Sequence, residues 1–592
     1  MISFDLIIVF IVILFILVAF YLELLGASFV FMIAIVILGI FGILTPSEIL
    51  SGFANEQIAV IILLLLMGEI IRKTTILEGI FDKIFVSVKN YKGFMARMYL
   101  IVTSISGFLN NTPLVAIMMP YVNTWCKKND ISPSKLLIPL SYSAILGGCM
   151  TLIGTSTNLI VNGLVVDQKI IPGLKSLEIF DFIYVGLPMA IIGFFYLYIF
   201  GDKLLPEKIP ASKDFSENER KYLVEAQIRP NSKLVGKTIE ESGLKEIKGL
   251  YLVEIIRRSY RITTFYPELI LNEEDQLIFA GNTDTIAELV KSNIGLVLPS
   301  VGMLVKKKKT EVVEVVVSHN SALINKTIKN FNFRSRYDAT LIAVHRNGEK
   351  ISGELSDIVL KAGDLLLLFT GDQFMNHAQN CQDFYFISLV KNFEKLESYK
   401  IVTILGGTVL AILLAAFKIV PLFMSLVILI LVALALKITS PKAIPRNIDF
   451  DLALIIALSL ALGTAMIKTG AAELIANLLI NIFVPLGAVG ILFGIHLITA
   501  ILAAYITNKA SVAIIFPISL TMATNLDLNP MPFIFVVAFG AAANFMTPIG
   551  YQTNLMVYGP GGYSFKDFFK IGFPLTLIYM IITILVLSLI YF

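Results

Sequence analysis

The sequence predicts a polytopic α-helical membrane protein made of two inverted repeats, with an α+β cytosolic module inserted between them. Composition is the first reason: 57% of the 592 residues are apolar, only 15% are charged, and the mean hydropathy is +0.83. Soluble proteins are about 45–50% apolar and about 25% charged. The second reason is that the apolar residues gather in runs of about twenty, enough to cross about 30 Å of hydrocarbon. The third is a polar middle, from about residue 202 to 399, that a bilayer would not accept.

Composition also excludes several classes of protein. The net charge of +4 carries no signal of nucleic-acid binding. The three cysteines, Cys126, Cys149 and Cys381, lie far apart, so neither a metal motif nor a disulfide framework is predicted. The first apolar run, Phe4 to Leu25, has no basic segment before it and no small-residue cleavage site. It is therefore predicted to be a retained helix and not a signal peptide.

Four segments follow from this distribution. Residues 1–201 are predicted to form membrane half 1 and residues 400–592 membrane half 2, while residues 202–300 and 301–399 form two small soluble domains. Each half is predicted to cross the membrane five times and to add one re-entrant hairpin. In the first half the crossings are about 4–24, 26–45, 57–71, 135–166 and 180–201, and the hairpin is about 94–125.

The hairpin is predicted from polar residues and a proline, Asn110 to Pro113, at the middle of an apolar segment. Irregular backbone at membrane depth is tolerated only where it is buried in protein or lines a cavity. The tip of the hairpin should therefore line a cavity.

The two membrane halves repeat one another. The segment Gly107–Pro120 matches Tyr505–Pro517, and Gly154–Leu159 matches Gly550–Leu555. The offset is 397 residues between the asparagines of the two tips and 396 between those of the two helix breaks. Two motifs in the same order at nearly the same offset indicate an internal duplication.

The odd number of crossings makes the duplication inverted, because the second half then begins on the opposite side of the membrane. Lysine and arginine gather in three segments, 72–93, 126–135 and 437–447. They are absent from the alternate loops 45–56 and 521–530. By the positive-inside rule the basic segments and residues 202–399 are cytoplasmic, and both termini are outside. The chain is thus predicted to be a multi-pass protein of the cell's inner (plasma) membrane.

The soluble zone is itself a tandem repeat, with an offset of 89 residues. Ser232 and Asp275 of the first unit match Ser321 and Asp364 of the second. Each unit resembles the C-terminal (TrkA-C) domain of regulators of potassium conductance, without the dinucleotide-binding lobe. The resemblance implies a ligand-sensing or dimerising role, with a small regulatory ligand of nucleotide type; a structural insert without a ligand is the alternative.

One motif in this zone resembles part of a nucleotide-hydrolysing site but lacks glycines that such a site requires. Gly236-Lys237-Thr238 looks like the end of a phosphate-binding loop, G-x-x-x-x-G-K-[ST]. Asn231 stands where the first glycine is needed, and Asn325 replaces the last glycine in the second unit. An ATP-driven pump is therefore not predicted.

Polar residues of both tips and both breaks are predicted to form a site near the membrane midplane, as in secondary transporters with inverted repeats. Helix N-termini there attract anions, and amide, hydroxyl and carbonyl oxygens can hold sodium without a permanent buried charge. The predicted substrate-binding residues are Asn110, Asn111, Thr112, Thr155, Thr157, Asn158, Thr507, Asn508, Lys509, Gln552, Thr553 and Asn554. The predicted sodium ligands are Asn111, Gly154, Asn508 and Gly550. The chain is predicted not to be an enzyme, with no catalytic residue and no cofactor, and with sodium, or alternatively protons, as the coupling ion.

These motifs resemble the divalent anion/sodium symporter family, part of a wider ion-transporter superfamily that includes citrate and arsenite permeases. That family carries Ser-Asn-Thr at both tips, where this chain has Asn110-Asn111-Thr112 and Thr507-Asn508-Lys509. The similarity spans both membrane halves, and Ile549–Tyr563 is similar to the sulfate-type branch that also carries tandem TrkA-C inserts. The resemblance implies an elevator-type symporter that works as a homodimer.

Lys509 departs from the family pattern, because it replaces a threonine at the second tip. No other lysine or arginine lies between residues 469 and 565. A lone basic residue within the membrane indicates a functional role. Its ammonium could replace the second sodium or bind the anion; the alternative is that it extends to the outer interface.

The sequence therefore predicts a secondary active transporter that imports sulfate or a similar small oxyanion. A carrier of di- or tricarboxylates such as succinate or citrate is the alternative; the tips hold no arginine to clamp a carboxylate, which favours sulfate. A ligand-gated potassium channel or transporter is disfavoured because no T-V-G-Y-G-like filter is present. The predicted partners are the anion, the bilayer and a second copy of the chain, with no nucleic acid.

Overall fold

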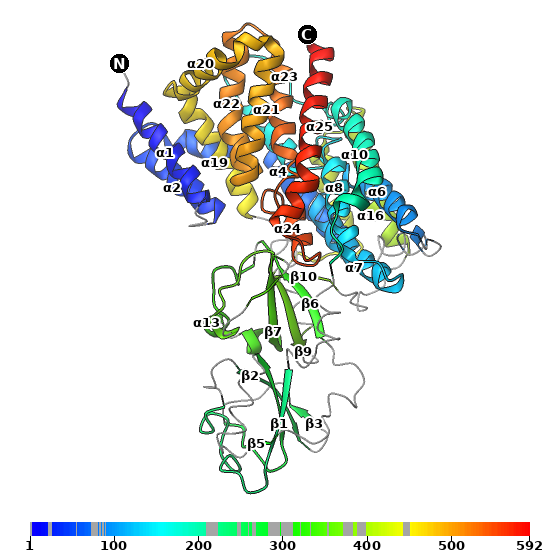
Figure 1. Ribbon diagram of the computed structural model, residues 1–592. Coiled ribbons are helices and arrows are strands. Elements are labelled where there is room, and N and C mark those ends of the chain that lie inside the picture. The colour runs from blue at the N-terminus through cyan, green and yellow to red at the C-terminus, as the bar shows by residue number, and fades with distance from the viewer. Residues whose placement is uncertain are drawn as a thin grey trace.

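The computed structural model shows a helical body with two small β units attached to it in series (Figure 1). It describes residues 3–21, 26–54, 56–72, 81, 84–85, 88, 90–208, 223–244, 250–257, 260–262, 268–281, 296–297, 312–319, 321–331, 333–347, 349–351, 355–370, 374, 383–387, 398–441 and 450–592. Cys381 and parts of the basic segments 72–93 and 437–447 lie outside these residues.

The helical body consists of two runs of apolar helices. Along the chain, the first run precedes the β units and the second run follows them. The first run is α1 (Phe4–Tyr21), α2 (Ala27–Ile40), α3 (Pro46–Ser51), α4 (Glu56–Arg72), α6 (Tyr91–Ser106), α7 (Asn111–Lys128), α8 (Leu137–Gly148), α9 (Ser156–Asp167) and α10 (Ile183–Leu204). The second run is α16 (Ser398–Ala416), α17 (Leu422–Ala435), α19 (Phe450–Lys468), α20 (Ala471–Phe483), α21 (Gly487–Tyr505), α22 (Asn508–Asn525), α23 (Pro530–Ala542), α24 (Gln552–Tyr558) and α25 (Phe565–Tyr591). Among the described residues, α10, the run Ala471–Tyr505 and α25 are each long and apolar enough to cross a membrane.

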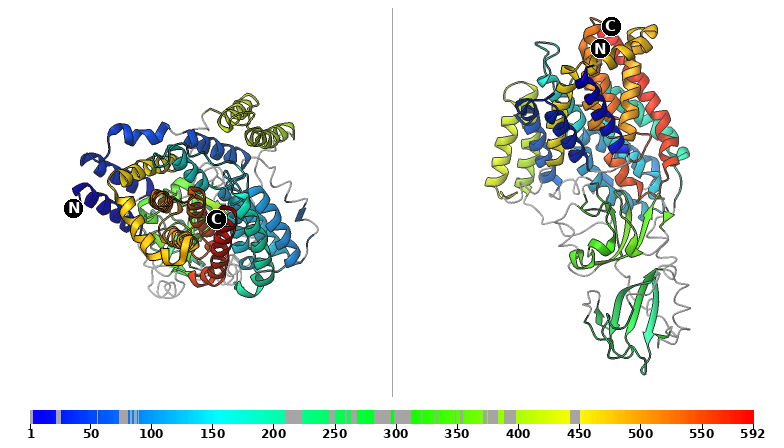
Figure 2. Two further views of the ribbon diagram at one scale, coloured as in Figure 1. Left: turned by 90° about the horizontal axis from the view of Figure 1, so that it is seen from above. Right: turned by 90° about the vertical axis from the view of Figure 1, so that its left-hand side faces the viewer.

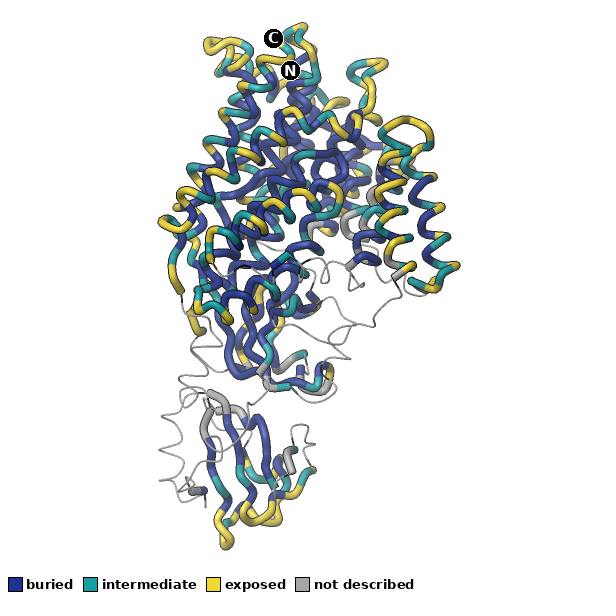
Figure 3. Tube along the Cα trace, turned by 90° about the vertical axis from the view of Figure 1, so that its right-hand side faces the viewer, coloured by how far each residue is buried: buried dark blue, intermediate teal, exposed yellow. Residues whose placement is uncertain are grey.

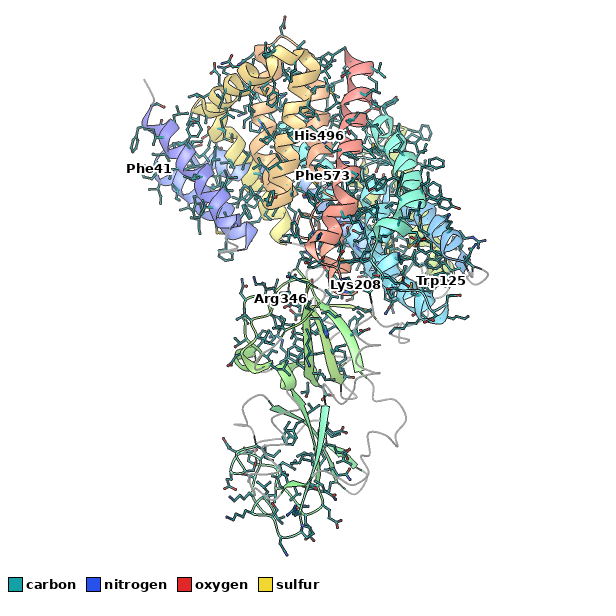
Figure 4. The ribbon with its side chains drawn as sticks, in the orientation of Figure 1. Phe41, Trp125, Lys208, Arg346, His496 and Phe573 are labelled. Atoms are coloured by element: carbon teal, nitrogen blue, oxygen red, sulfur yellow. The ribbon has the colours of Figure 1, made fainter. Side chains whose placement is uncertain are left out.

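Many positions along the helices of the helical body are exposed (Figure 3), and large apolar side chains occupy many of them. On α25 an exposed apolar side chain recurs at every fourth residue: Phe569, Phe573, Leu577, Ile581, Leu585 and Leu589. Phe573 is labelled on this helix in Figure 4. Residues four apart share one face of a helix, so this stripe would face water in a soluble protein. Such a continuous apolar face is suited to lipid.

The two runs of helices follow the same order. In the first run, a short connection joins α6 to α7 and an irregular segment, 149–155, separates α8 from α9. In the second run, a short connection joins α21 to α22 and segment 543–551 separates α23 from α24. The connections coincide with the tips, and the irregular segments with the breaks, that the sequence motifs predict.

The first β unit (residues 223–297) contains a five-stranded antiparallel sheet of strand order β3-β2-β4-β1-β5. The second β unit (residues 312–387) has the order β10-β6-β9-β7-β8, which is the same topology. The strands of the first unit are β1 (Leu223–Ile228), β2 (Leu250–Arg257), β3 (Tyr260–Ile262), β4 (Gln276–Gly281) and β5 (Leu296–Val297). Those of the second are β6 (Val312–Val317), β7 (Ala339–Arg346), β8 (Glu349–Lys350), β9 (Leu365–Thr370) and β10 (Phe384–Phe386), accompanied by the short helices α13 (Ile328–Phe331) and α14 (Phe333–Tyr337).

The two sheets repeat at the offset of 89 residues that the sequence contains. Leu223 pairs with Ala280 in the first sheet, and Val312 pairs with Phe369 in the second. Both sheets also carry one buried aspartate clamped by an arginine. Arg257 donates two hydrogen bonds of 2.8 Å to Asp275, and Arg346 donates two of 2.7 Å to Asp364.

The second β unit lies between the helical body and the first β unit (Figure 2). Val253, Ile256 and Ile278 of the first β unit belong to the hydrophobic core of the second. Each sheet has a small core of its own, and a unit of this size buries little apolar surface alone. The shared core therefore joins the two units.

Replacing Asp364 by asparagine should loosen the second β unit, because it removes the charge that holds the Arg346 guanidinium. Hydrogen bonds to charged groups are worth about 1.5–3 kcal/mol, so we expect the free energy of local opening to fall by about 1–3 kcal/mol. Hydrogen–deuterium exchange of the β9 amides in the full-length protein measures this. The matched variant Asp275→Asn should instead accelerate exchange in β4. If the β9 amides of Asp364→Asn exchange as slowly as those of the unchanged protein, the ion pair between Arg346 and Asp364 does not stabilise the second β unit.

Candidate functional site

The first tip joins α6 to α7 inside the helical body. Asn110 precedes α7, and its Oδ1 accepts a hydrogen bond of 3.3 Å from the backbone N–H of Thr112. Asn110 thus caps one of the free N–H groups at the start of the helix. Pro113 is accommodated in the first turn, where the residue has no intrahelical N–H bond to lose. Asn111, the first residue of α7, is buried, with 1% of its surface exposed.

The second tip joins α21 to α22 in the same way. The Thr507 side chain accepts a hydrogen bond of 3.1 Å from the backbone N–H of Ala510 and so caps α22. Asn508 and Lys509 are the first two residues of that helix. The equivalent asparagines Asn111 and Asn508 therefore both begin a helix at a tip.

Each break is stabilised by a threonine that is not among the predicted site residues. The Thr151 Oγ1 accepts a hydrogen bond of 3.1 Å from the N–H of Gly154. The Thr547 Oγ1 accepts one of 3.1 Å from the N–H of Gly550. Each threonine hydroxyl also donates to a backbone carbonyl just before the tip of its own half, that of Gly107 and that of Ala504. Every break is thus tied to its neighbouring tip.

The break asparagines complete this arrangement. Asn158 Nδ2 donates to the Thr151 carbonyl at 2.9 Å, and Asn554 Nδ2 donates to the Thr547 carbonyl at 3.2 Å. Both asparagine side chains are fully buried. They bond carbonyls that no intact helix satisfies, so their position in the breaks is dictated by the backbone.

The first tip meets the break of the other half through Tyr551. The Tyr551 hydroxyl accepts a hydrogen bond of 2.6 Å from Asn111 Nδ2 and lies 3.2 Å from the Thr155 hydroxyl. The Thr112 hydroxyl donates to Gln552 Oε1 at 2.9 Å. Residues about 440 positions apart in the chain therefore share one hydrogen-bonded cluster.

Further contacts bring the remaining elements together. Ser141 Oγ on α8 lies 2.8 Å from Thr553 Oγ1 and 2.7 Å from Asn554 Oδ1. Helix α9, which begins at the first break, packs against α22, which begins at the second tip. Thr157 is buried on α9. Both tips and both breaks thus lie in one region of the helical body.

Two buried amide oxygens in this region have no hydrogen-bond partner among the described residues: Asn158 Oδ1 and Asn508 Oδ1. Both polar side-chain atoms of Asn544, within the second break, are likewise buried and have no partner among the described residues. A buried acceptor without a partner costs about 1–3 kcal/mol. Oxygen atoms of this kind are the ligands that hard cations prefer. The unpartnered oxygens of Asn158 and Asn508 are therefore available as ligands for a sodium ion, whereas Asn111 Oδ1 accepts a hydrogen bond from the Ser106 hydroxyl.

The second β unit reaches the same region. His319, in the segment after β6, is half-buried; Gln552 Nε2 lies 2.6 Å from its Nδ1 and 2.5 Å from its Nε2, and the Tyr385 hydroxyl lies 2.8 Å from Nδ1. Burial, together with the positive charge of Lys509, lowers the pKa of His319 to about 3. His319 is therefore neutral at physiological pH, and a neutral ring nitrogen can accept a hydrogen bond.

The half-buried Lys509 thus lies near His319 and the β units. It is the one charged residue in the tips 107–113 and 505–509 and the breaks 149–158 and 543–554. The region is otherwise built from uncharged oxygen and nitrogen groups.

Sequence reasoning missed several residues of this region. Thr151 and Thr547 are 396 residues apart, the same offset as the break asparagines, so the repeat could have revealed them. Ser106, Ser141 and Tyr551 carry no such signal, because their contacts come from other elements. His319 and Tyr385 lie in a separate unit, and nothing in their local sequence links them to the helical body.

Comparison with known proteins identifies related chains over nearly the whole length. A family model described as "Citrate transporter" matches residues 10–497 and, in a second match, residues 411–592. The second match begins inside the first, within the second run of helices.

Three relatives illustrate the range of similarity. An uncharacterized transporter of Synechocystis is 34% identical over 98% of this chain and 96% of its own length. A Chlamydomonas reinhardtii protein, provisionally named as a regulator of the response to sulfur deprivation, is 32% identical over 92% of this chain and 94% of its own. Sodium/sulfate cotransporter 1 of the same alga is 23% identical over 91% of this chain and 84% of its own.

Replacing Gly154 by alanine should disrupt the first break. A Cβ at this position would lie 2.6 Å from the Gly148 carbonyl oxygen and 2.9 Å from that of Ser106, both backbone atoms that cannot move aside easily. Overpacking of this kind costs about 1–3 kcal/mol. We expect a lower midpoint of thermal unfolding and loss of function. Gly463→Ala is the control, since nothing lies within 4 Å of its added Cβ. Equal behaviour of the two variants would contradict the tight packing of the break.

Proposed function

The chain belongs to the citrate transporter family of secondary membrane transporters, and on that premise we propose that it imports sulfate or a similar small oxyanion together with sodium. Membership in this family makes the chain a multi-pass membrane protein and a transporter of anions, not an enzyme. The observation that carries the proposal is that the first tip, the first break and the second break share one hydrogen-bonded cluster, with buried amide oxygens left unpartnered in the same region.

Each predicted residue has a role in this proposal. Sodium is held by oxygens of the Asn111 and Asn508 side chains and of the backbone at Gly154 and Gly550. The anion is bound by hydroxyl and amide groups of the tips and breaks, and by the N-termini of α7 and α22, whose free N–H groups favour negative charge. Sulfate then needs no buried arginine. The site residues for the anion are Asn110, Asn111, Thr112, Thr155, Thr157, Asn158, Thr507, Asn508, Lys509, Gln552, Thr553 and Asn554.

We propose that the two helix runs are inverted repeats, each with five crossings and one re-entrant hairpin. Figure 1 supports this, since α6 and α7 lie toward the end of the helical body that faces the β units, whereas α20 and α22 lie toward the opposite end. Lys127, at the end of α7, lies 3.9 Å from Glu314 of the second β unit, so a basic segment and the β units share one side. By the positive-inside rule that side is the cytoplasm, which puts both termini outside.

The remaining parts of the proposal concern assembly and regulation. The β units are two TrkA-C-type domains at residues 202–300 and 301–399, and their shared topology supports a common origin. The protein works as a homodimer in which one bundle carries the site across the membrane against a fixed scaffold. The apolar pair α16 and α17, at the edge of the helical body in Figure 2, is available to such a scaffold.

The choice between sulfate and a carboxylate is open to one experiment. Sulfate is favoured because the tips and breaks contain no arginine and because relatives include a sodium/sulfate cotransporter. The description of the family model favours citrate. We expect labelled sulfate, and not succinate or citrate, to exchange in counterflow across proteoliposomes containing the purified protein, with a rate that depends on sodium. Exchange of citrate or succinate alone would overturn the choice of sulfate.

The role of Lys509 is tested by Lys509→Thr, which restores the threonine of the family pattern. If the ammonium replaces a sodium ion, the variant should couple more sodium per anion while uptake persists. If the ammonium binds the anion, the apparent affinity should fall by about 1.5–3 kcal/mol, the worth of a hydrogen bond to a charged group. Sodium dependence and substrate KM in proteoliposomes distinguish the two. No change in either quantity would exclude both roles.

A further inference from the structure

The second β unit contacts the candidate site of the helical body directly. Gln552 begins α24 at the second break, and its two side-chain ends face different partners. Its Oε1 accepts a hydrogen bond of 2.9 Å from Thr112 of the first tip. Its Nε2 lies against the His319 ring, 2.6 Å from Nδ1 and 2.5 Å from Nε2, and 3.4 Å from the Tyr385 hydroxyl. One side chain thus joins the β unit to the tip and the break.

The surroundings of this contact form a packed interface. A Cβ added to Gly559 of the helical body would lie 2.7 Å from the Gly363 carbonyl oxygen, so the two backbones approach as closely as glycine permits. Gly363 has a φ of +83°, a conformation that favours glycine. The Tyr558 hydroxyl donates to Asn347 Oδ1 at 2.9 Å. Val316, Leu365 and Ile387 of the second β unit belong to the hydrophobic core of the helical body.

The helices that the second β unit contacts are helices that form the candidate site. Glu314 and β10 contact α7, the helix that begins at the first tip. Gly363 lies against Leu555 of α24, the helix that begins at the second break, and Leu365 lies against Gly559, the residue that follows α24. A displacement of either helix would therefore disturb the interface. Conversely, while the unit is docked, the amide N–H groups of Gln552 are directed to His319 and Tyr385 and are withheld from an anion.

The two β units differ at the positions that make this contact. At the offset of 89 residues, His319 corresponds to Pro230 and Tyr385 to Leu296. Neither side chain can donate or accept a hydrogen bond. The first β unit lies away from the helical body, beyond the second (Figure 2). Among the residues that the structure describes, the copy that carries the polar pair is the one that contacts the candidate site, although both copies have the same sheet topology.

We propose that the second β unit is a cytosolic gate of the transport site, in which His319 and Tyr385 hold Gln552 and the unit must withdraw before the site opens to the cytoplasm. This rests on the proposed function for the identity of the site and of its cytosolic side. The first β unit, joined to the gate through their shared core, is then placed to transmit a regulatory signal to it.

The gate is tested by the accessibility of the site from the cytosolic side. Thr112→Cys is introduced as a probe into full-length protein in which Cys126, Cys149 and Cys381 are replaced by alanine, and inside-out vesicles are treated with a membrane-impermeant maleimide. Adding His319→Ala and Tyr385→Phe removes both contacts to Gln552. Since neutral hydrogen bonds each shift an equilibrium several-fold, labelling of the probe should become about tenfold faster.

Tyr558→Phe is the matched control, because it removes a hydrogen bond from the same interface without touching Gln552. It should leave the labelling rate near that of the probe variant alone. Equal labelling rates in the His319→Ala/Tyr385→Phe variant and its parent would overturn the proposal. So would an equal acceleration by Tyr558→Phe, since the effect would then come from general loosening of the unit. The assay needs no substrate, so its result is independent of whether sulfate is carried.

A second experiment tests the gate by holding the second β unit in its docked position. Asn347→Cys and Tyr558→Cys, in the same cysteine-free protein, are joined by a short bifunctional thiosulfonate that a reductant removes. Counterflow of the transported anion should fall at least tenfold after joining and return after reduction. Full counterflow while the unit is joined to the helical body would overturn the gate. If no tested anion exchanges before joining, the proposed function fails, and the labelling arm still decides whether the gate exists.

Discussion

A helix that is interrupted inside a membrane leaves backbone N–H and C=O groups without partners, and the architecture of this protein depends on how those groups are satisfied. Thr151 and Thr547 accept hydrogen bonds from the glycine N–H groups of the breaks and donate to carbonyls next to the tips. Asn158 and Asn554 bond the carbonyls of the same threonines. The breaks and tips are therefore not independent loops, because each half ties its own pair together by the same bonds.

This constraint also explains why the candidate site is built from uncharged polar residues. A permanent charge in the membrane is costly, whereas an asparagine or threonine can satisfy the backbone with one atom and present another to a ligand. Asn158 does so: its Nδ2 bonds a break carbonyl while its buried Oδ1 has no described partner. Tyr551 then connects the halves, since its hydroxyl contacts the first tip and the first break from the second half. The same residues thus stabilise the fold and form the site, so substitutions in them affect both.

The β units show how a duplicated domain acquires two positions in one molecule. Both copies keep the strand order and the arginine–aspartate clamp, because these stabilise a small sheet from within. Their outer surfaces have diverged, and only the second copy carries a histidine and a tyrosine at the contact with Gln552. Burial and the positive charge of Lys509 lower the pKa of His319 to about 3, so the ring that contacts Gln552 is neutral. The surface of the helical body around Gln552 is therefore complementary to the second of the two similar β units.

The sequence by itself determined the division into two helical runs and a β insert, the position of tips and breaks, and the repeat offsets of 396, 397 and 89 residues. These features are local, because apolar runs, helix caps and glycine at a break depend on neighbouring residues. It could also point to Asn111, Asn158, Asn508 and Asn554, since duplication marks them twice. Only the tertiary structure decided which tip meets which break, through Tyr551 and Gln552, and that His319 and Tyr385 lie against them. Contacts between residues hundreds of positions apart depend on how whole helices pack, and the sequence around each residue does not specify which helices pack against one another.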